Sequence, residues 1–334
     1  MATYKKDKGL NVKSYTADPD KTYPSAFEGN LYYNSSDGQF KYIGLGAGAW
    51  ASGGNMNLSK KYDAGCGTTT AACNFGGRTH PPEYQRDEME IYNGTTWSED
   101  ADLNTRRDNM HSASGTSTDT MASGGFGYPN THRDAVEQWD GSSWTEIAEF
   151  NTDRRSGAFT SPPSGTSTDA LSITGNNSAA NVEQWNGSAW TELTDVNSQR
   201  IDLGRAGTTT AALIMGGESP TANVAIVESW NGSTWTETTD MNSAKRGLGS
   251  GGTQTAALGY GRVSPDFSGI TESWDGSAWT EIADMATARG QGGSSGVATG
   301  GNTDAIASGG GRPATSNLTE EFTFSHAFKK VTTS

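Results

Sequence analysis

Short stretches in which apolar and polar residues alternate recur along the whole chain and predict β-strands. In "EQWDGSSWTEI" (Glu137–Ile147), two such stretches flank a turn that contains Asp-Gly, which is typical of a β-hairpin. Alternate residues of a strand share one sheet face, so Trp139 and Trp144 should lie on the same face. In this part of the chain the pattern predicts four strands, at Asn109–Ser114, Asp119–Gly124, Ala135–Trp139 and Ser143–Ile147.

This four-strand pattern is one copy of a repeat. Its second Trp recurs every 44 to 47 residues, at Trp50, Trp97, Trp144, Trp190, Trp235 and Trp279. A Glu followed two residues later by an aromatic residue marks each copy, at Glu90, Glu137, Glu183, Glu228, Glu272 and Glu320. A third marker is a strand of small residues that ends in glycine, such as "AACNFGG" and "AALIMGG". The three markers each occur six times.

A single four-stranded sheet of this size is marginally stable, and its paired aromatic residues need a partner surface. The neighbouring copy is the obvious partner, which predicts an all-β fold, a β-propeller of six blades. The copies begin at a Trp strand and end at a Glu-x-aromatic strand. Three ways to complete the ring stay open: the strand near Trp50 closes the last blade, Ser325–Ser334 supplies the missing strand, or Leu31–Ile43 contributes to a seventh blade. Six blades closed by the strand near Trp50 is our prediction.

The order Gly-Gly, Tyr or Trp, Trp, then Met-Asn-x-x-Arg resembles the Kelch repeat, from about Trp50 to Phe324. The sequence motif "WNGSxW" and the Gly/Ser/Thr-rich first strand resemble those of Kelch-like propellers in structural proteins of marine tailed bacteriophages. "GNLYYNSSDGQFK" (Gly29–Lys41) resembles a hairpin module of phage tail and fibre proteins. The resemblance implies an N-terminal attachment arm and hairpin over 1–48 and a propeller over 49–334.

Propeller topology places the second-to-third and fourth-to-first connections on one face. These connections differ in every copy, whereas the other turns are short and uniform, so the variable face is the predicted binding face. It should carry the aromatic residues of the variable loops: Tyr84, Phe126, Tyr128, Tyr260 and Phe267.

The same face should carry a cation from every copy, at Lys60, Arg107, Arg154, Arg200, Lys245 and Arg289. Two interpretations are open. In the first, which we favour, each cation pairs with a carboxylate such as the repeated Glu90, Glu137 or Glu183. In the second, some of the cations line the mouth of the channel and bind an anionic ligand. In some Kelch proteins arginines at this position line a ligand pocket, and the resemblance extends that role to these six residues.

Composition narrows the function classes. The chain has 334 residues, a formal net charge of −14 and no apolar run long enough to span a bilayer, so we expect neither nucleic-acid binding nor membrane insertion. The basic start lacks the apolar run of a secretory signal. The two cysteines, Cys66 and Cys73, are expected as packed free thiols, with a local cross-strand disulfide as the alternative.

No catalytic or metal-binding constellation stands out. The four histidines are scattered, and "HPPEYQRDE" (His80–Glu88) lacks a metal-ligand spacing. We therefore predict neither an enzyme nor a cofactor.

The sequence predicts a virion structural protein of a tailed phage, assembled in the host cytoplasm and present in several copies on the tail or capsid exterior. As a tail fibre or receptor-binding component, it would present the propeller face to a host-surface glycan or protein and contact other virion proteins through its N-terminal arm. The alternative is a capsid decoration or tail adaptor protein that binds only virion proteins.

Overall fold

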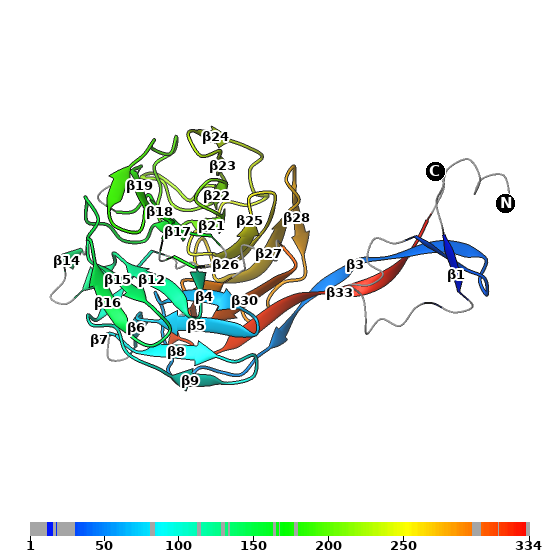
Figure 1. The fold of residues 1–334 in the computed structure, drawn as a ribbon, viewed down its shortest axis with the longest axis horizontal. Helices are drawn as coiled ribbons and strands as arrows, with labels where there is room; N and C mark the ends of the chain where they lie inside the picture. Colours follow the sequence, from blue (N-terminus) through cyan, green and yellow to red (C-terminus); the bar gives the residue numbers. More distant parts are fainter. Residues whose placement is uncertain are drawn as a thin grey trace. The chain divides into compact units, whose positions relative to one another are not determined.

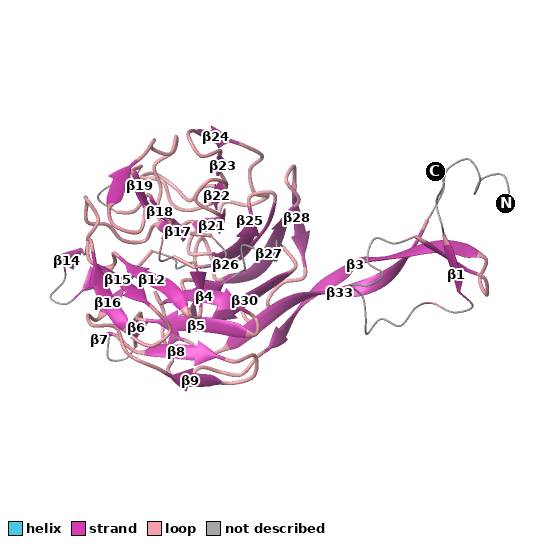
Figure 2. Cartoon of the chain, in the orientation of Figure 1, coloured by secondary structure: helices cyan, strands magenta, loops and turns pink. Residues whose placement is uncertain are grey.

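The chain is built from β-strands joined by turns, and no helix occurs in the residues that the structure describes (Figure 2). The computed structural model describes residues 12–15, 18, 31–80, 84–111, 115–127, 131–132, 134–162, 165–166, 168–176, 180–295, 302–312 and 314–331. Within these ranges no helix is long and apolar enough to cross a membrane.

Two compact units divide the chain. Unit 1 comprises Met1–Ala49 together with Phe324–Ser334, and unit 2 comprises Trp50–Thr323. The N-terminal boundary thus falls one residue from the expected one at 48/49. The last eleven residues, which the sequence analysis placed in the propeller domain, group instead with the N-terminal segment.

The described residues of unit 2 form five four-stranded antiparallel sheets, each from consecutive parts of the chain (Figure 1). The first sheet consists of β4 (Ala64–Thr68), β5 (Ala71–Phe75), β8 (Met89–Tyr92) and β9 (Trp97–Glu99). The second consists of β11 (Gly115–Thr116), β12 (Asp119–Ser123), β15 (Val136–Trp139) and β16 (Trp144–Ile147). The third consists of β17 (Ala158–Thr160), β18 (Ala170–Ile173), β19 (Val182–Trp185) and β20 (Trp190–Glu192).

The fourth and fifth sheets have the same order. They consist of β21 (Gly204–Gly207), β22 (Ala212–Met215), β23 (Val227–Trp230) and β24 (Trp235–Glu237), and of β25 (Gly249–Thr253), β26 (Ala256–Arg262), β27 (Ser268–Trp274) and β28 (Trp279–Ile282). First strands of successive sheets lie side by side, since β17 contacts β21, β21 contacts β25, and β4 contacts β11 (Figure 1). Unit 2 is therefore a propeller-like arrangement of antiparallel sheets.

A sixth sheet joins the two ends of the chain in the strand order β1-β2-β3-β33-β30-β29. Its strands are β1 (Lys13–Tyr15), β2 (Tyr32–Asn34), β3 (Gln39–Ser52), β29 (Gly293–Ser295), β30 (Asp304–Ser308) and β33 (Thr319–Lys330). Of the three alternatives for the last copy, this order places the strand that contains Trp50 beside β33. Residues of Ser325–Ser334 continue β33 as far as Lys330, and Leu31–Ile43 contributes β2 and the start of β3 to this same sheet.

The remaining strands are short and lie in the connections. They form the pairs β6 (Arg78–Thr79) with β7 (Tyr84–Gln85) and β31 (Gly311–Arg312) with β32 (Ala314–Thr315), and the group β10 (Arg107–Asp108), β13 (Phe126–Gly127) and β14 (Thr131–His132). The strand predicted over Asn109–Ser114 is found later, as β11 at Gly115–Thr116. Residues 112–114 lie outside the described residues.

The hairpin turns explain why the aromatic pair is retained in every copy. Trp139 lies directly opposite Trp144 in the β15–β16 register, so both rings lie on one face, as predicted. The connecting turn is held by Asp140, whose carboxylate accepts the backbone N–H groups of Ser142 at 2.9 Å and Ser143 at 2.8 Å. Gly141 has a φ of +92°, a left-handed conformation that glycine adopts without strain.

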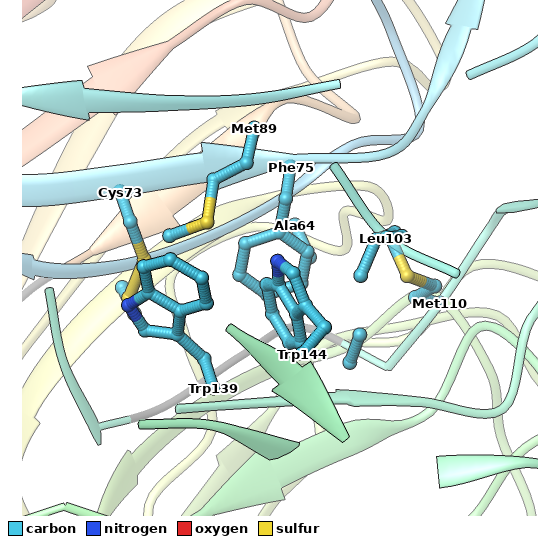
Figure 3. Close-up of a cluster of buried hydrophobic side chains, with 10 residues drawn as sticks. Ala64, Cys73, Phe75, Met89, Leu103, Met110, Trp139 and Trp144 are labelled. Carbon is cyan, nitrogen blue, oxygen red and sulfur yellow. A yellow bond between two sulfur atoms is a disulfide. The ribbon is translucent and has the colours of Figure 1, made fainter. Parts of the chain in front are cut away.

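Each aromatic pair is buried against the preceding sheet. Trp144 packs edge-on against Phe75 of the first sheet with ring centroids 5.0 Å apart, and Met89 lies in the same cluster (Figure 3). Similar clusters join the third sheet to the fourth and the fourth to the fifth. The expectation that neighbouring copies cover each other's apolar faces is thus met at these seams.

Cys66 and Cys73 face each other across β4 and β5 and form a disulfide, with Cα atoms 5.2 Å apart. The favoured expectation of two free thiols is therefore corrected to the alternative of a cross-strand bridge. The register explains the difference. The turn at Thr69–Thr70 makes the two cysteines direct partners, which brings their side chains within bonding distance.

Candidate functional site

The six repeated cations are buried at the start of each sheet. Their exposed fractions run from 0 to 2%, for Lys60, Arg107, Arg154, Arg200, Lys245 and Arg289. Five of them form ion pairs with the repeated glutamate of the following third strand, at Arg107–Glu137, Arg154–Glu183, Arg200–Glu228, Lys245–Glu272 and Arg289–Glu320. The sixth, Lys60, donates to the carbonyl of Glu88 at 3.1 Å and lies in the field of Glu90.

The other oxygen of each glutamate holds the chain that leads to the cation. It accepts the backbone N–H of Asn57, Asn104, Asn151, Asn197, Asn242 or Ala286 at 2.7 to 3.0 Å. One carboxylate thus neutralises a buried charge and also satisfies a loop donor. Burial still lowers the pKa of Lys60, Arg154, Arg200, Lys245 and Arg289, that of Arg154 to about 10, because a charged group loses solvation in the interior.

This burial matches the interpretation in which each repeated cation pairs with a carboxylate. None of the six lines the polar cavity described below. Arg200 lines a neighbouring cavity of about 300 Å³, together with Glu218 and Pro220.

The aromatic residues of the predicted face have different positions. Tyr84 and Phe267 are exposed, at 58% and 37%. Phe126 is half-buried, and the guanidinium carbon of Arg155 lies 4.8 Å from its ring centroid. Tyr128 lies outside the described residues.

Tyr260 is a core residue, which corrects its placement in a variable loop. It lies inside β26, is 1% exposed and donates its hydroxyl to the carbonyl of Ile306 at 3.0 Å. The residue directly opposite is Gly249, where a Cβ atom would overlap the ring. The glycine leaves room for the aromatic ring inside the sheet, so the ring does not turn toward solvent.

Two residues after each repeated cation, the chain adopts a left-handed conformation, with φ between +49° and +61° at Tyr62, Asn109, Ser156, Asp202, Gly247 and Gln291. These residues bond to one another through the backbone. In the five copies from Asn109 to Gln291, the backbone N–H of this residue donates to the backbone carbonyl of the equivalent residue in the preceding copy, at 2.8 to 3.0 Å. The sixth bond runs from the N–H of Tyr62 to the carbonyl of Gln291 at 2.6 Å.

A cavity of about 310 Å³, here called the polar cavity, opens above five of these residues. Its floor is formed by Tyr62, Asn109, Ser156, Asp202 and Gln291, and its wall by Arg78, Arg155, Asn176, Ile201 and Arg246. A smaller space of about 70 Å³ continues below the floor and is lined in part by Met110, Leu203 and Leu248. The walls come from second-to-third and fourth-to-first connections, so the cavity lies on the face that the sequence analysis selected.

Two of the three wall arginines form ion pairs with carboxylates that do not line the cavity. Arg78 donates from Nε to the buried carboxylate of Asp108 at 2.7 Å, and Arg246 pairs with Glu218. Arg155 forms no ion pair with any of the described residues, and its buried Nε–H has no acceptor there. The polar cavity thus contains one cation, Arg155, that acts on the carboxyls of Asp108 and Asp202 without forming a direct ion pair with either.

Asp202 is the acidic group of the polar cavity. Burial raises its pKa, while the charge of Arg246 acts in the opposite direction. Burial also raises the pKa of Tyr62 on the floor. The remaining polar groups are neutral amides and a hydroxyl, so the cavity offers a guanidinium, a carboxyl and several neutral hydrogen-bonding groups within a small volume.

Sequence reasoning missed Arg78, Arg155, Arg246 and Asp202. A signal for two of them was present, since Arg155 and Arg246 directly follow a repeated cation at a position that otherwise varies between Lys61, Asp108, Ile201 and Gly290. Residues that vary beside a repeated one indicate a surface that the scaffold does not constrain.

No protein-family model and no curated protein matches the chain. Over the described ranges, no three His, Cys, Asp or Glu side chains come together in a geometry that could hold a metal ion.

Proposed function

We propose that unit 2 is a closed six-bladed propeller. The cycle of backbone hydrogen bonds from Tyr62 through Gln291 supports this, because a cycle of six such bonds needs six equivalent segments around one axis. The contact of β29 with β4 supports it as well, since these are the first strands of the sixth and first sheets. In this arrangement the strand around Trp50 completes the last blade, so that β33 is not left as an unpaired edge.

The propeller acts as a binding module for a ligand at the host cell surface, a glycan or a protein. The observation that carries this proposal is the polar cavity with its unpaired Arg155. Arg155 is half-buried, and its buried Nε–H has no acceptor among the described residues; a buried donor without an acceptor costs free energy unless a ligand supplies one. The exposed Tyr84 and Phe267 lie in second-to-third connections, as does the wall residue Arg78, and provide aromatic surface there.

In the proposed context, the chain is a virion protein of a tailed phage, a tail fibre or receptor-binding component. This assignment is supported by the resemblance of the repeat sequence and of the N-terminal hairpin sequence to phage structural proteins. Repetition of one module on a particle gives avidity to a weak site.

Unit 1 attaches the chain to the particle. Its binding partner is another virion protein, whose surface is acidic and partly apolar. Unit 1 carries eight lysines against five acidic residues, whereas unit 2 carries sixteen basic against thirty-three acidic residues. Four large apolar side chains of unit 1 are 37 to 51% exposed, namely Leu31, Phe40, Tyr42 and Val331. Such a surface suits docking through apolar contact and charge complementarity.

Binding of the fluorescently labelled protein to host cells tests the proposal. Wild-type protein should adsorb and should compete with particles for adsorption. The double variant Tyr84→Ala/Phe267→Ala should bind about tenfold more weakly, because exposed aromatic residues are common binding hot spots. The control, Thr95→Ala/Thr118→Ala, removes two exposed threonines from turns of the opposite face and should bind like wild type.

Adsorption that survives the aromatic double variant would contradict the assignment of the binding face. Antibody labelling that locates the chain only inside the particle would contradict the receptor-binding role itself.

A further inference from the structure

We infer that the polar cavity binds the terminal acidic sugar of a glycan, a residue that carries a carboxylate, with Arg155 as the carboxylate-binding group. The inference rests on the proposed binding function and names the ligand class of that site. Three properties of the cavity carry it: its charge, its neutral hydrogen-bonding groups and its size.

The charge distribution favours an anionic group of the ligand at Arg155, while the carboxyl of Asp202 lines the same cavity. The Asp108 and Glu218 carboxylates already satisfy Arg78 and Arg246, so Arg155 is the remaining acceptor-seeking cation of the wall. Its guanidinium lies over the ring of Phe126, which restrains the position of the donor fork. A fixed guanidinium presents two parallel N–H groups that match the two oxygens of a carboxylate.

The neutral groups suit hydroxyls on the same ligand. The amides of Asn109, Asn176 and Gln291 each have two N–H donors and a carbonyl acceptor, so they can bond sugar hydroxyls beside the bonds they make within the protein, such as that from Asn109 to Asp108. The carboxyl of Asp202 accepts from a further hydroxyl. A bare anion such as sulfate would use the guanidinium but not the amides, and a neutral sugar would leave Arg155 without a carboxylate.

Size limits the ligand to one sugar residue inside the site. A volume of about 310 Å³ lies at the lower end of the range for small-molecule sites. The space of about 70 Å³ that shares Tyr62, Asn109, Ser156, Asp202 and Gln291 with the polar cavity is too small for a second sugar residue. The ligand therefore enters from the loop face by its end.

Calorimetric titration of the full-length protein with D-glucuronic acid, D-glucose, sodium sulfate and L-alanine tests the inference. We expect binding of D-glucuronic acid that is at least about tenfold tighter than binding of the other three, because a charge-assisted hydrogen-bond pair contributes about that factor or more. R155Q should reduce the affinity for D-glucuronic acid about 10- to 100-fold. R155K keeps the charge but loses the planar fork, and it should give an intermediate affinity.

The control variant is R106Q, which alters an exposed arginine that pairs with Asp87 outside the cavity. It should bind D-glucuronic acid like wild type. Thermal unfolding of all variants checks that each is folded. Because Arg155 has no ion pair to lose, R155Q should unfold close to the wild-type temperature.

Each contrary result would overturn a specific part of the inference. Equal binding of D-glucose removes the need for a carboxylate, equal binding of sulfate reduces the site to a bare anion site, and tighter binding of L-alanine replaces the sugar by a zwitterion. Cell adsorption without any D-glucuronic acid binding overturns this inference and leaves the proposed function in place.

Discussion

At the residue scale, the two adjacent arginines Arg154 and Arg155 have different roles. Arg154 lies in the interior with Glu183 as its partner, whereas its neighbour Arg155 lines the polar cavity without a carboxylate. The difference arises because a buried charge needs a counter-charge, and the repeated glutamate is positioned for only one of the two side chains. The repeated ion pairs are therefore structural elements of each sheet, although their residue types suggest a binding ring.

Glu137→Gln should destabilise the protein strongly. The change leaves the guanidinium of Arg107 buried without a counter-charge, and breaking one partner of such a pair typically costs about 3–5 kcal/mol. Urea unfolding followed by circular dichroism measures the loss.

Glu146→Gln is the matched control. Glu146 lies directly opposite Glu137 in the β15–β16 register but is exposed, so its change should stay within about 0.5 kcal/mol. Equal effects of the two variants would show that the buried pair contributes no more than a surface charge.

Strands of two to seven residues make up the sheets of unit 2, apart from the two long strands β3 and β33, and they depend on packing between sheets. Trp50 of β3 illustrates this at the scale of the element. Its ring lies 4.9 Å from Tyr260 of the fifth sheet and 5.4 Å from Phe322 of the sixth, and its indole N–H donates to Thr271 at 3.0 Å. An N-terminal strand thus joins two sheets formed by the C-terminal part of the chain.

Trp50→Ala should lower the free energy of unfolding of unit 2 by about 3 kcal/mol, since it removes a large side chain from an inter-sheet contact. Near-ultraviolet circular dichroism during thermal unfolding measures the effect. Phe40→Ala, in the same strand but 46% exposed within unit 1, should change the unfolding of unit 2 by less than about 1 kcal/mol. A Trp50→Ala protein as stable as wild type would refute the role of this strand in unit 2.

Charge is distributed unevenly over the whole molecule. Unit 2 holds most of the acidic excess, while its six repeated cations are buried beneath the surface. Exposed carboxylates therefore repel one another across the sheets and their turns, and this repulsion opposes the compact state. The buried pairs are screened much less by salt than the surface charges.

Thermal stability should consequently rise with ionic strength. The Debye length falls from about 30 Å at 0.01 M salt to about 8 Å at 0.15 M, so surface repulsion weakens while the buried pairs keep their interaction. We expect the midpoint temperature to rise by a few degrees over this range in differential scanning calorimetry. Chloride and acetate salts at equal ionic strength separate screening from anion binding. A midpoint that falls with salt would mean that exposed ion pairs dominate stability.

The sequence alone predicted the strands of the repeat, the shared face of Trp139 and Trp144, and the pairing of repeated cations with repeated glutamates. It failed at Tyr260, which was assigned to the variable connection although β26 continues to Arg262. It also failed to favour the disulfide, since spacing alone does not show that Cys66 and Cys73 are direct partners. The residues of the polar cavity were not predicted, because they come from different copies at positions without a common type.

What the sequence determined by itself is the local chemistry of one repeat, because period-two alternation, Asn-Gly and Asp-Gly turns and repeated polar partners act between residues close in the chain. Only the tertiary structure decided which side chains reach solvent and which groups meet at the centre of the loop face. Those outcomes depend on contacts between distant segments, such as Tyr62 with Gln291 and Gly249 with Tyr260, whose register is set by the packing of whole sheets.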